Sequence, residues 1–139
     1  MKSGLEAIRW IDLPNAVDER GVLTAVEGGR SIPFEIRRVF YMHGTPSGID
    51  RGGHAHRDTQ QVVIPVSGRF DVELSDGREA RPYVLSDPNR GLYMPPMIFI
   101  RLQNFSAQAV CLVLADTHYD RSKSIRTWEE FLSTVRGAA

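Results

Sequence analysis

Cysteine is nearly absent from this sequence, which has only Cys111 among its 139 residues. A single cysteine cannot form an intramolecular disulfide, so the fold has to rest on its core, and a reducing compartment is the simpler expectation. Cys111 lies in the apolar run 109–114, where a small buried hydrophobe is favoured over a catalytic thiol.

A net charge is also missing, because seventeen basic side chains balance seventeen acidic ones. Proteins whose main partner is nucleic acid or an anionic membrane carry a basic excess, so we expect neither partner here. No apolar run approaches the ~20 residues that span a bilayer. Residues 1–6 lack the uninterrupted apolar stretch of a secretion signal. We therefore expect a cytoplasmic protein.

What the sequence does contain is a series of short apolar segments separated by turn residues. Segment 69–74 alternates apolar and charged side chains, as a half-buried strand does, and the Asp76-Gly77 pair after it suits a tight hairpin. Strands are expected at 36–42, 61–66, 69–74, 80–85, 91–94, 98–104 and 109–115. This regular spacing favours an all-β barrel or sandwich in a single domain, 1–139, over an α/β fold.

Helical spacing is confined to the C-terminal segment. From Ser124 onward apolar side chains recur every three or four residues, and Gly137 ends the pattern. The apolar positions are Ile125, Trp128, Phe131, Leu132 and Val135. The segment is predicted to form a short helix with one apolar face, either as a lid on the barrel exterior or as an interface element.

The N-terminal segment up to Ala25 carries apolar residues that one small barrel would cover poorly. They are Ile8, Trp10, Ile11, Leu13, Val22 and Leu23. Segments of this kind often pair with the sheet edge of a neighbouring chain. We therefore expect a homodimer with exchange of N-terminal strands.

The stretch from Gly48 to Gly68 carries the chemistry. Its polar positions His54, His56 and Gln61 resemble, in their spacing, the first signature of the cupin superfamily, with Gln61 where metal-binding cupins have glutamate. Because strand side chains alternate, the two histidines point to the same side of a strand. Inside a small barrel that side is the cavity, where two imidazoles can hold a metal or move protons.

The second cupin signature, in the frame of residues 95–104, distinguishes these two roles. Met97 stands at its glycine position and Ile100 at its histidine position. With Gln61, two of the four usual metal ligands are therefore missing, and tight binding of a first-row metal needs about three or four protein donors. We expect no metal and no other cofactor.

Further motifs occur at 18–23, 32–41, 51–56, 91–96, 104–106 and 111–115. Together they resemble the WxcM-like dTDP-4-keto-6-deoxyhexose 3,4-ketoisomerases over nearly the whole chain; the Arg-Gly-Gly-His-Ala-His core at 51–56 is the specific part. The resemblance implies an all-β, cupin or RmlC-like jelly-roll barrel, dimeric and without a metal. It also implies a dTDP-linked sugar substrate, whose carbonyl moves from C4 to C3 in deoxysugar biosynthesis.

The resemblance also implies catalytic roles. It indicates His56 as the main base, which takes a proton from C3 and returns it to C4 through an enediol or enediolate. His54 is expected as its partner, orienting the substrate or handling the hydroxyl proton. Tyr41, on the preceding strand, is expected to donate a hydrogen bond to the developing oxyanion.

Three further residues are expected to bind the substrate. Arg51 offers paired donors to a diphosphate. Gln61 is expected to orient the histidines through its amide, and His43 to contribute to the polar lining near Tyr41. His118 is expected on the surface.

Other functions stay open at this point. A related cupin nucleotide-sugar epimerase would share the fold and the base chemistry but leave the ketone in place. A catalytically silent sugar-binding cupin or regulatory subunit would keep the fold without turnover. A metal-dependent dioxygenase would need the ligands that Gln61 and Ile100 have replaced. The apolar Met97 and Ile100 could also narrow the substrate range or abolish activity.

Overall fold

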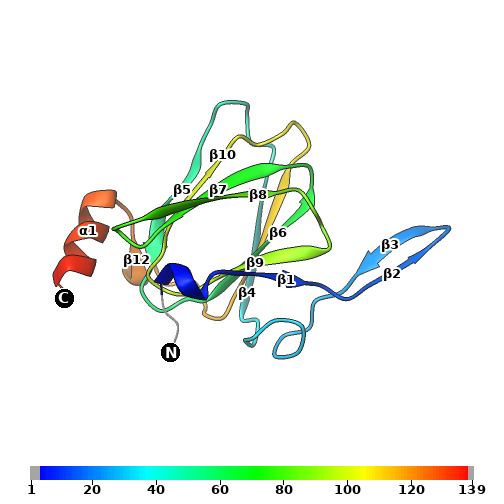
Figure 1. The fold of residues 1–139 in the computed structure, drawn as a ribbon, viewed down its shortest axis with the longest axis horizontal. Helices are drawn as coiled ribbons and strands as arrows, with labels where there is room; N and C mark the ends of the chain where they lie inside the picture. Colours follow the sequence, from blue (N-terminus) through cyan, green and yellow to red (C-terminus); the bar gives the residue numbers. More distant parts are fainter. Residues whose placement is uncertain (1–3, 138–139) are drawn as a thin grey trace.

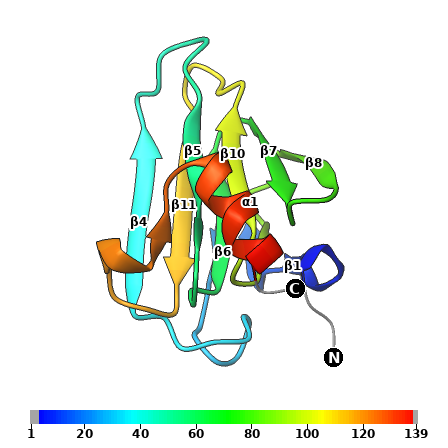
Figure 2. The ribbon, with the colours of Figure 1, turned by 90° about the vertical axis from the view of Figure 1, so that its left-hand side faces the viewer.

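The computed structural model describes residues 4–137, which form two facing five-stranded antiparallel sheets (Figure 1, Figure 2). The first sheet consists of β1 (Arg9–Asp12), β9 (Arg90–Met94), β6 (Gln61–Ser67), β11 (Val110–Ala115) and β4 (Arg38–His43), in that order. The second consists of β12 (Ser124–Ile125), β5 (Arg51–His56), β10 (Phe99–Gln103), β7 (Phe70–Ser75) and β8 (Ala80–Leu85). A separate hairpin pairs β2 (Asn15–Asp18) with β3 (Gly21–Thr24). Short 3-10 helices lie at η1 (Gly4–Ala7) and η2 (Arg121–Lys123), and one α-helix, α1 (Trp128–Gly137), ends the described chain.

The expected all-β architecture is confirmed. Each of the seven strands expected from the sequence is present, with ends that differ by at most two residues from the expected ones. In β7 the alternating side chains Phe70, Val72 and Leu74 are buried, whereas Asp71 and Glu73 between them are half-buried. The period of two therefore identified the face that packs in the core.

The main core lies between the two sheets. Leu74 and Leu102 of the second sheet belong to the same buried cluster as Leu92 and Val113 of the first. Cys111 is wholly buried in this cluster, and desolvation raises the pKa of its thiol to about 12. A thiol that stays protonated at neutral pH is a poor nucleophile, so Cys111 is a core residue, as expected.

The outer face of the first sheet has a second core beneath the segment that leads into β4. Ile32 and Phe34 of this segment pack with Leu13 and with Ile64 of β6. β1 itself pairs with β9 of the same sheet. The expectation that one barrel would leave the whole N-terminal segment uncovered was therefore wrong for Ile8, Trp10, Ile11 and Leu13, which pack against the two cores.

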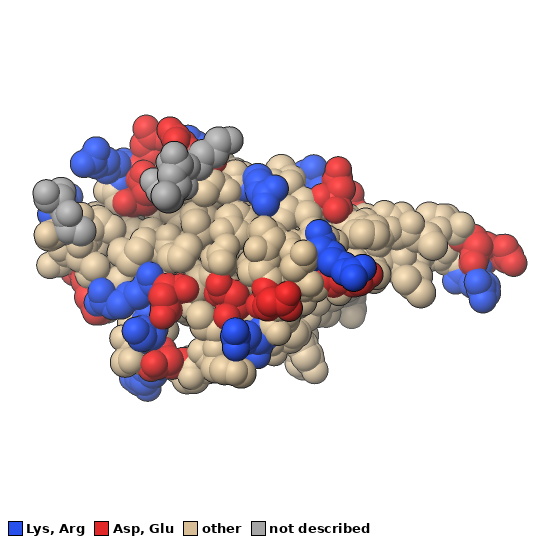
Figure 3. Space-filling model, turned by 90° about the horizontal axis from the view of Figure 1, so that it is seen from below, with Lys and Arg blue, Asp and Glu red and all other residues tan. Residues whose placement is uncertain are grey.

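The hairpin β2–β3 is the part of the N-terminal segment that does remain uncovered. It projects from the barrel as an arm (Figure 1), and Val17, Val22 and Leu23 are all exposed. Seen from below, charged side chains gather at the tip of the arm and few lie along its shaft (Figure 3). Asp18 and Arg20 form an ion pair at the tip.

The C-terminal helix begins later than the sequence periodicity suggested. Ser124 and Ile125 are not helical but form β12, which pairs with β5. The helix begins after Thr127, whose hydroxyl accepts a hydrogen bond from the backbone N–H of Glu130 at 3.1 Å and so caps it. Phe131 is wholly buried against Ala55 and Phe99, which places α1 on the outer face of the second sheet, where Figure 2 shows it in front of β5 and β10. No helix within residues 4–137 is long and apolar enough to cross a bilayer.

A β-bulge in the second sheet sets the direction of the histidine strand. Ile100 pairs with His54 and Arg101 pairs with Gly52, so Gly53 is left over between them. Both glycines have left-handed backbone angles, φ +83° at Gly52 and +74° at Gly53. Only glycine adopts such angles without strain, so the two glycines make the bulge that precedes His54.

Alanine substitutions at Gly52 and Gly53 separate the energetic cost of left-handed backbone strain from that of a steric clash. A Cβ at Gly52 would lie 2.7 Å from the carbonyl oxygen of Ile100, whereas one at Gly53 would meet nothing within 4 Å. We expect Gly53→Ala to lower the free energy of unfolding by the left-handed strain alone, about 1–2 kcal/mol. Gly52→Ala adds a clash with the backbone and should cost more. Urea unfolding of both variants checks this; equal losses would contradict it.

Candidate active site

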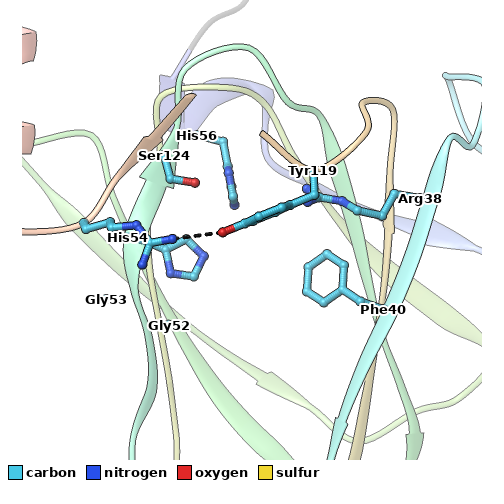
Figure 4. A pocket seen from close by; sticks show the side chains of 9 residues that line it. Arg38, Phe40, Gly52, Gly53, His54, His56, Tyr119 and Ser124 are labelled. Atoms are coloured by element: carbon cyan, nitrogen blue, oxygen red, sulfur yellow. Dashed lines mark hydrogen bonds between the residues drawn. The ribbon is translucent and has the colours of Figure 1, made fainter. Parts of the chain in front are cut away.

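A cavity of about 460 Å³ opens between β4 and β5, the strands at which the edges of the two sheets meet. Figure 4 shows side chains entering it from both strands and from the segment after β11. The lining residues are Arg38, Phe40, Gly52, Gly53, His54, His56, Tyr119, Ser124 and Arg126. The cavity is large enough for a sugar ring and open enough to admit one.

Both histidines of the motif reach this cavity from β5. Their ring centroids are 4.9 Å apart with an angle of 79° between the planes. Ala55 between them points to the opposite side, where it is wholly buried under α1. The side-chain alternation expected from the sequence therefore holds, and two imidazoles share one cavity.

Burial lowers the pKa of both imidazoles below the ordinary value. Desolvation is the largest cause in each ring. In His56 the charges of His54 and Arg38 add to it and the pKa falls to about 4. In His54 a hydrogen bond with the Gly52 backbone offsets part of the lowering, and nearby arginines, Arg126 first, add to it. Both rings are thus neutral at pH 7 and have a lone pair that can accept a proton.

An inner pocket of about 110 Å³ continues behind His54 into the barrel. Gln61 and Ile100 both line it together with His54. The positions that correspond to cupin metal ligands thus converge, but an amide and an alkyl group occupy two of them. Across residues 4–137, no group of three or more His, Cys, Asp or Glu side chains lies close enough to hold a metal ion.

The structure does not bring Tyr41 and His43 to this cavity. Alternation along β4 turns Arg38, Phe40 and Met42 inward, and turns Tyr41 and His43 to the exposed outer face, where Tyr41 is 63% exposed. The expected oxyanion donor and the expected polar lining near it therefore lie on the other side of the strand. Arg51 is exposed at the start of β5 and lines the inner pocket.

Five side chains that were not predicted as site residues from the sequence lie in the cavity instead, and one of them is Ser124 of β12. Arg38 and Phe40 come from β4, and Tyr119 and Arg126 come from the segments on either side of η2. Arg38 and Phe40 could have been considered from the sequence, because side chains alternate along a strand and either they or their neighbours Val39 and Tyr41 had to face the cavity. Tyr119 and Arg126 gave no local signal, since only the return of the chain to β5 brings them to the histidines.

The cavity is electropositive. Arg38 lies over the rings of Phe40 and Tyr119, with its guanidinium carbon 5.2 and 5.5 Å from the two ring centroids. Its Nε is buried without a hydrogen-bond partner. In the described part of the chain no carboxylate pairs with Arg38 or Arg126, so their positive charge is available to an anionic ligand.

Two facing antiparallel sheets with a pair of neutral imidazoles between them define a cupin-type barrel with a site suited to proton transfer. The chain belongs to the FdtA family, described as WxcM-like, C-terminal, whose model matches residues 6–136.

Three relatives illustrate the similarity. The TDP-4-oxo-6-deoxy-alpha-D-glucose-3,4-oxoisomerase of Aneurinibacillus thermoaerophilus is 36% identical over 121 residues, 87% of each chain. The 3,4-ketoisomerase QdtA of Thermoanaerobacterium thermosaccharolyticum, solved with TDP, is 32% identical over 96% of this chain and 98% of its own, with a TM-score of 0.93. A dTDP-4-dehydrorhamnose 3,5-epimerase from Bacillus anthracis shares the fold at 15% identity, with a TM-score of 0.76 over 89% of this chain and 80% of its own.

The low pKa of His56 links the site to stability. The unfolded chain binds a proton at this histidine near pH 6.5 and the folded protein only near pH 4. The free energy of unfolding should therefore fall as the pH drops from about 6.5 towards 4. His56→Asn removes this contribution and should show a shallower fall in urea unfolding across that range. Other titrating groups are common to both proteins, so parallel slopes would contradict the assignment.

Proposed function

We propose that this protein isomerises a TDP-linked 4-keto-6-deoxyhexose to its 3-keto isomer. The observation that carries the proposal is the pair of neutral imidazoles inside a cavity of a chain that belongs to this family. The curated relative is a 3,4-oxoisomerase of such a sugar, and a QdtA variant has been solved with TDP-4-keto-6-deoxyglucose bound.

The reaction needs a base and an acid but no redox cofactor. Moving the ketone removes a proton from C3 and delivers one to C4 through an enediol or enediolate, and no electron leaves the sugar. A neutral imidazole can take the first proton and, as an imidazolium, return it at the neighbouring carbon. A histidine that is neutral at rest and faces the sugar can therefore carry out both proton transfers.

His54 is the better candidate for this base, and His56 for its partner. His54 lines both the outer cavity and the inner pocket, so it can face a sugar bound in either space. The pKa of His56 falls to about 4, far below neutral pH, which makes this ring a poor proton acceptor there. Its buried Nε2 has no hydrogen-bond partner, so it is free to accept one from a sugar hydroxyl. This proposal assigns the two histidines the reverse of the roles that the family resemblance implies.

The diphosphate is attracted by the arginines around the cavity. The positive charges of Arg126, Arg38 and Arg51 all lower the pKa of His54. The three guanidinium groups are therefore near enough to the proposed base to attract an anion bound beside it. Guanidinium groups offer paired donors to phosphate oxygens. With no carboxylate in the cavity lining, this charge favours a substrate with a negatively charged tail.

Replacing the base tests the reaction. His54→Asn should lower kcat by at least ~10²-fold, the usual scale for removal of a general base, and His56→Asn should lower it less. The assay incubates the 4-keto sugar nucleotide in deuterated water and follows carbonyl position and C3 exchange by NMR. His118→Asn, a change to an exposed histidine outside the cavity, is the matched control.

The outcomes separate the candidate functions. Carbonyl migration by the wild-type protein identifies an isomerase, whereas exchange without migration identifies an epimerase. A larger loss in His56→Asn than in His54→Asn would restore His56 as the main base. Unchanged turnover in both variants would place the chemistry elsewhere.

The exposed hairpin β2–β3 supports a second part of the proposal, a homodimer with exchanged N-terminal strands. Val17 and Leu23 are 72% and 68% exposed, and both belong to backbone that can pair with another sheet edge. Thr24 and Asn89 hold the base of the arm to its own barrel through a 2.6 Å hydrogen bond. The arm is thus fixed at one end and uncovered along its length.

Charge on the arm should separate the protomers. In Leu23→Asp, a carboxylate would have to enter an apolar interface, so we expect sedimentation to show monomers at micromolar concentration where the wild type is dimeric. Glu19→Gln at the exposed tip serves as control and should leave the assembly unchanged. A wild-type protein that sediments only as a monomer would contradict the dimer.

A further inference from the structure

The cavity contains a tyrosine hydroxyl group to which the proton transfer between carbon atoms assigns no role. β4 presents Phe40 to the cavity, which has no hydroxyl, and Tyr41 points away from it. Among the lining residues only Tyr119 and Ser124 carry a hydroxyl. In Figure 4 the ring of Tyr119 crosses the cavity from the side of β4, and its hydroxyl is directed towards the side occupied by His54 and His56.

Arg126 holds this hydroxyl from one side. Its Nη2 donates a hydrogen bond to the Tyr119 oxygen at 3.1 Å. Because Arg126 fills an acceptor position of the phenol, the phenol's own proton stays available for another acceptor. The guanidinium of Arg126 lies beside this oxygen, and Arg38 places a second positive charge 5.5 Å from the ring centroid, so both can balance negative charge on the oxygen during the reaction.

The isomerisation moves protons on oxygen as well as on carbon. When C3 loses its proton, the C4 carbonyl oxygen becomes negative, and when C4 gains one, the C3 hydroxyl has to lose its proton. The imidazole that carries the carbon proton is protonated between these events and cannot also act on oxygen. A second group that gives and then takes a proton is therefore required. The imidazole of His56 has a pKa of about 4, so it has no imidazolium proton to give at neutral pH, whereas a phenol can give its proton and take one back.

We propose that Tyr119, held by Arg126, is this second group, an inference that rests on the proposed function. As His54 takes the C3 proton, the phenol gives its proton to the C4 carbonyl oxygen, which yields the neutral enediol and a phenolate. The phenolate then takes the proton of the C3 hydroxyl while the imidazolium of His54 protonates C4. Both residues return to their starting states, and Arg126 stabilises the phenolate in between.

Removing the hydroxyl tests this role. Tyr119→Phe keeps the ring that lies under Arg38 and should lower kcat by ~10²-fold or more, the scale of general acid catalysis, with KM changed less than about twofold. Tyr83→Phe is the matched control, because this partly buried ring packs edge-on against Trp10 at the edge of the core and is not part of the cavity lining. Equal kcat values for Tyr119→Phe and the wild type would overturn the proposal.

A pH profile distinguishes proton transfer from a merely structural role. Replacing Tyr119 by a fluorinated tyrosine lowers the pKa of the phenol at nearly constant shape, so the alkaline limb of the kcat profile should move to lower pH. Arg126→Gln removes the hydrogen bond to the phenol oxygen and should lower kcat. An alkaline limb that stays in place in the fluorinated protein would show that Tyr119 only positions Arg126, and would overturn the proposal.

The experiment separates failure of this inference from failure of the proposed function. If the wild-type protein moves no carbonyl, the proposed function itself fails. If the wild type isomerises the sugar and Tyr119→Phe does so equally well, only the role of Tyr119 fails.

Discussion

Two imidazoles can act as bases inside this barrel only while they are uncharged, and their burial keeps them so. Desolvation is the largest cause of the lowered pKa of both His54 and His56, and the arginines around them add to it. The arginines that would attract an anionic substrate therefore also help burial to keep the histidines unprotonated at rest. The positive charge of the site thus supports its readiness for proton transfer.

The cavity exists because the barrel is open along one seam. β4 is the edge of the first sheet, and β5 with the short β12 forms the edge of the second. Inward side chains from these edges line a space that the core does not fill. The bulge at Gly52 and Gly53 belongs to this edge, which explains why the sequence concentrates glycine directly before the histidines.

The fold was largely predictable because the chain consists of short apolar segments separated by turn residues, and in some of these segments buried and less buried side chains alternate. Alternation in β7 and turn residues between segments marked the strands to within two residues. Two features went wrong for a common reason, since they depend on contacts between distant segments. Ile125 has helical spacing relative to Trp128, but pairing with β5 makes it a strand residue. Leu13 belongs to an uncovered segment by its sequence, yet Ile32 and Phe34 cover it.

By itself the sequence determined that two imidazoles share a cavity without the usual metal ligands, because strand alternation and residue type are local properties. Which face of β4 meets that cavity was decided by its pairing with β11, where Phe40 lies beside the buried Val113 and Tyr41 beside Leu112. Tyr119 and Arg126 joined the site only through the return of the chain to β5. A residue that reaches the site only through contacts between distant segments cannot be predicted from hydrophobic periodicity or from the spacing of a motif.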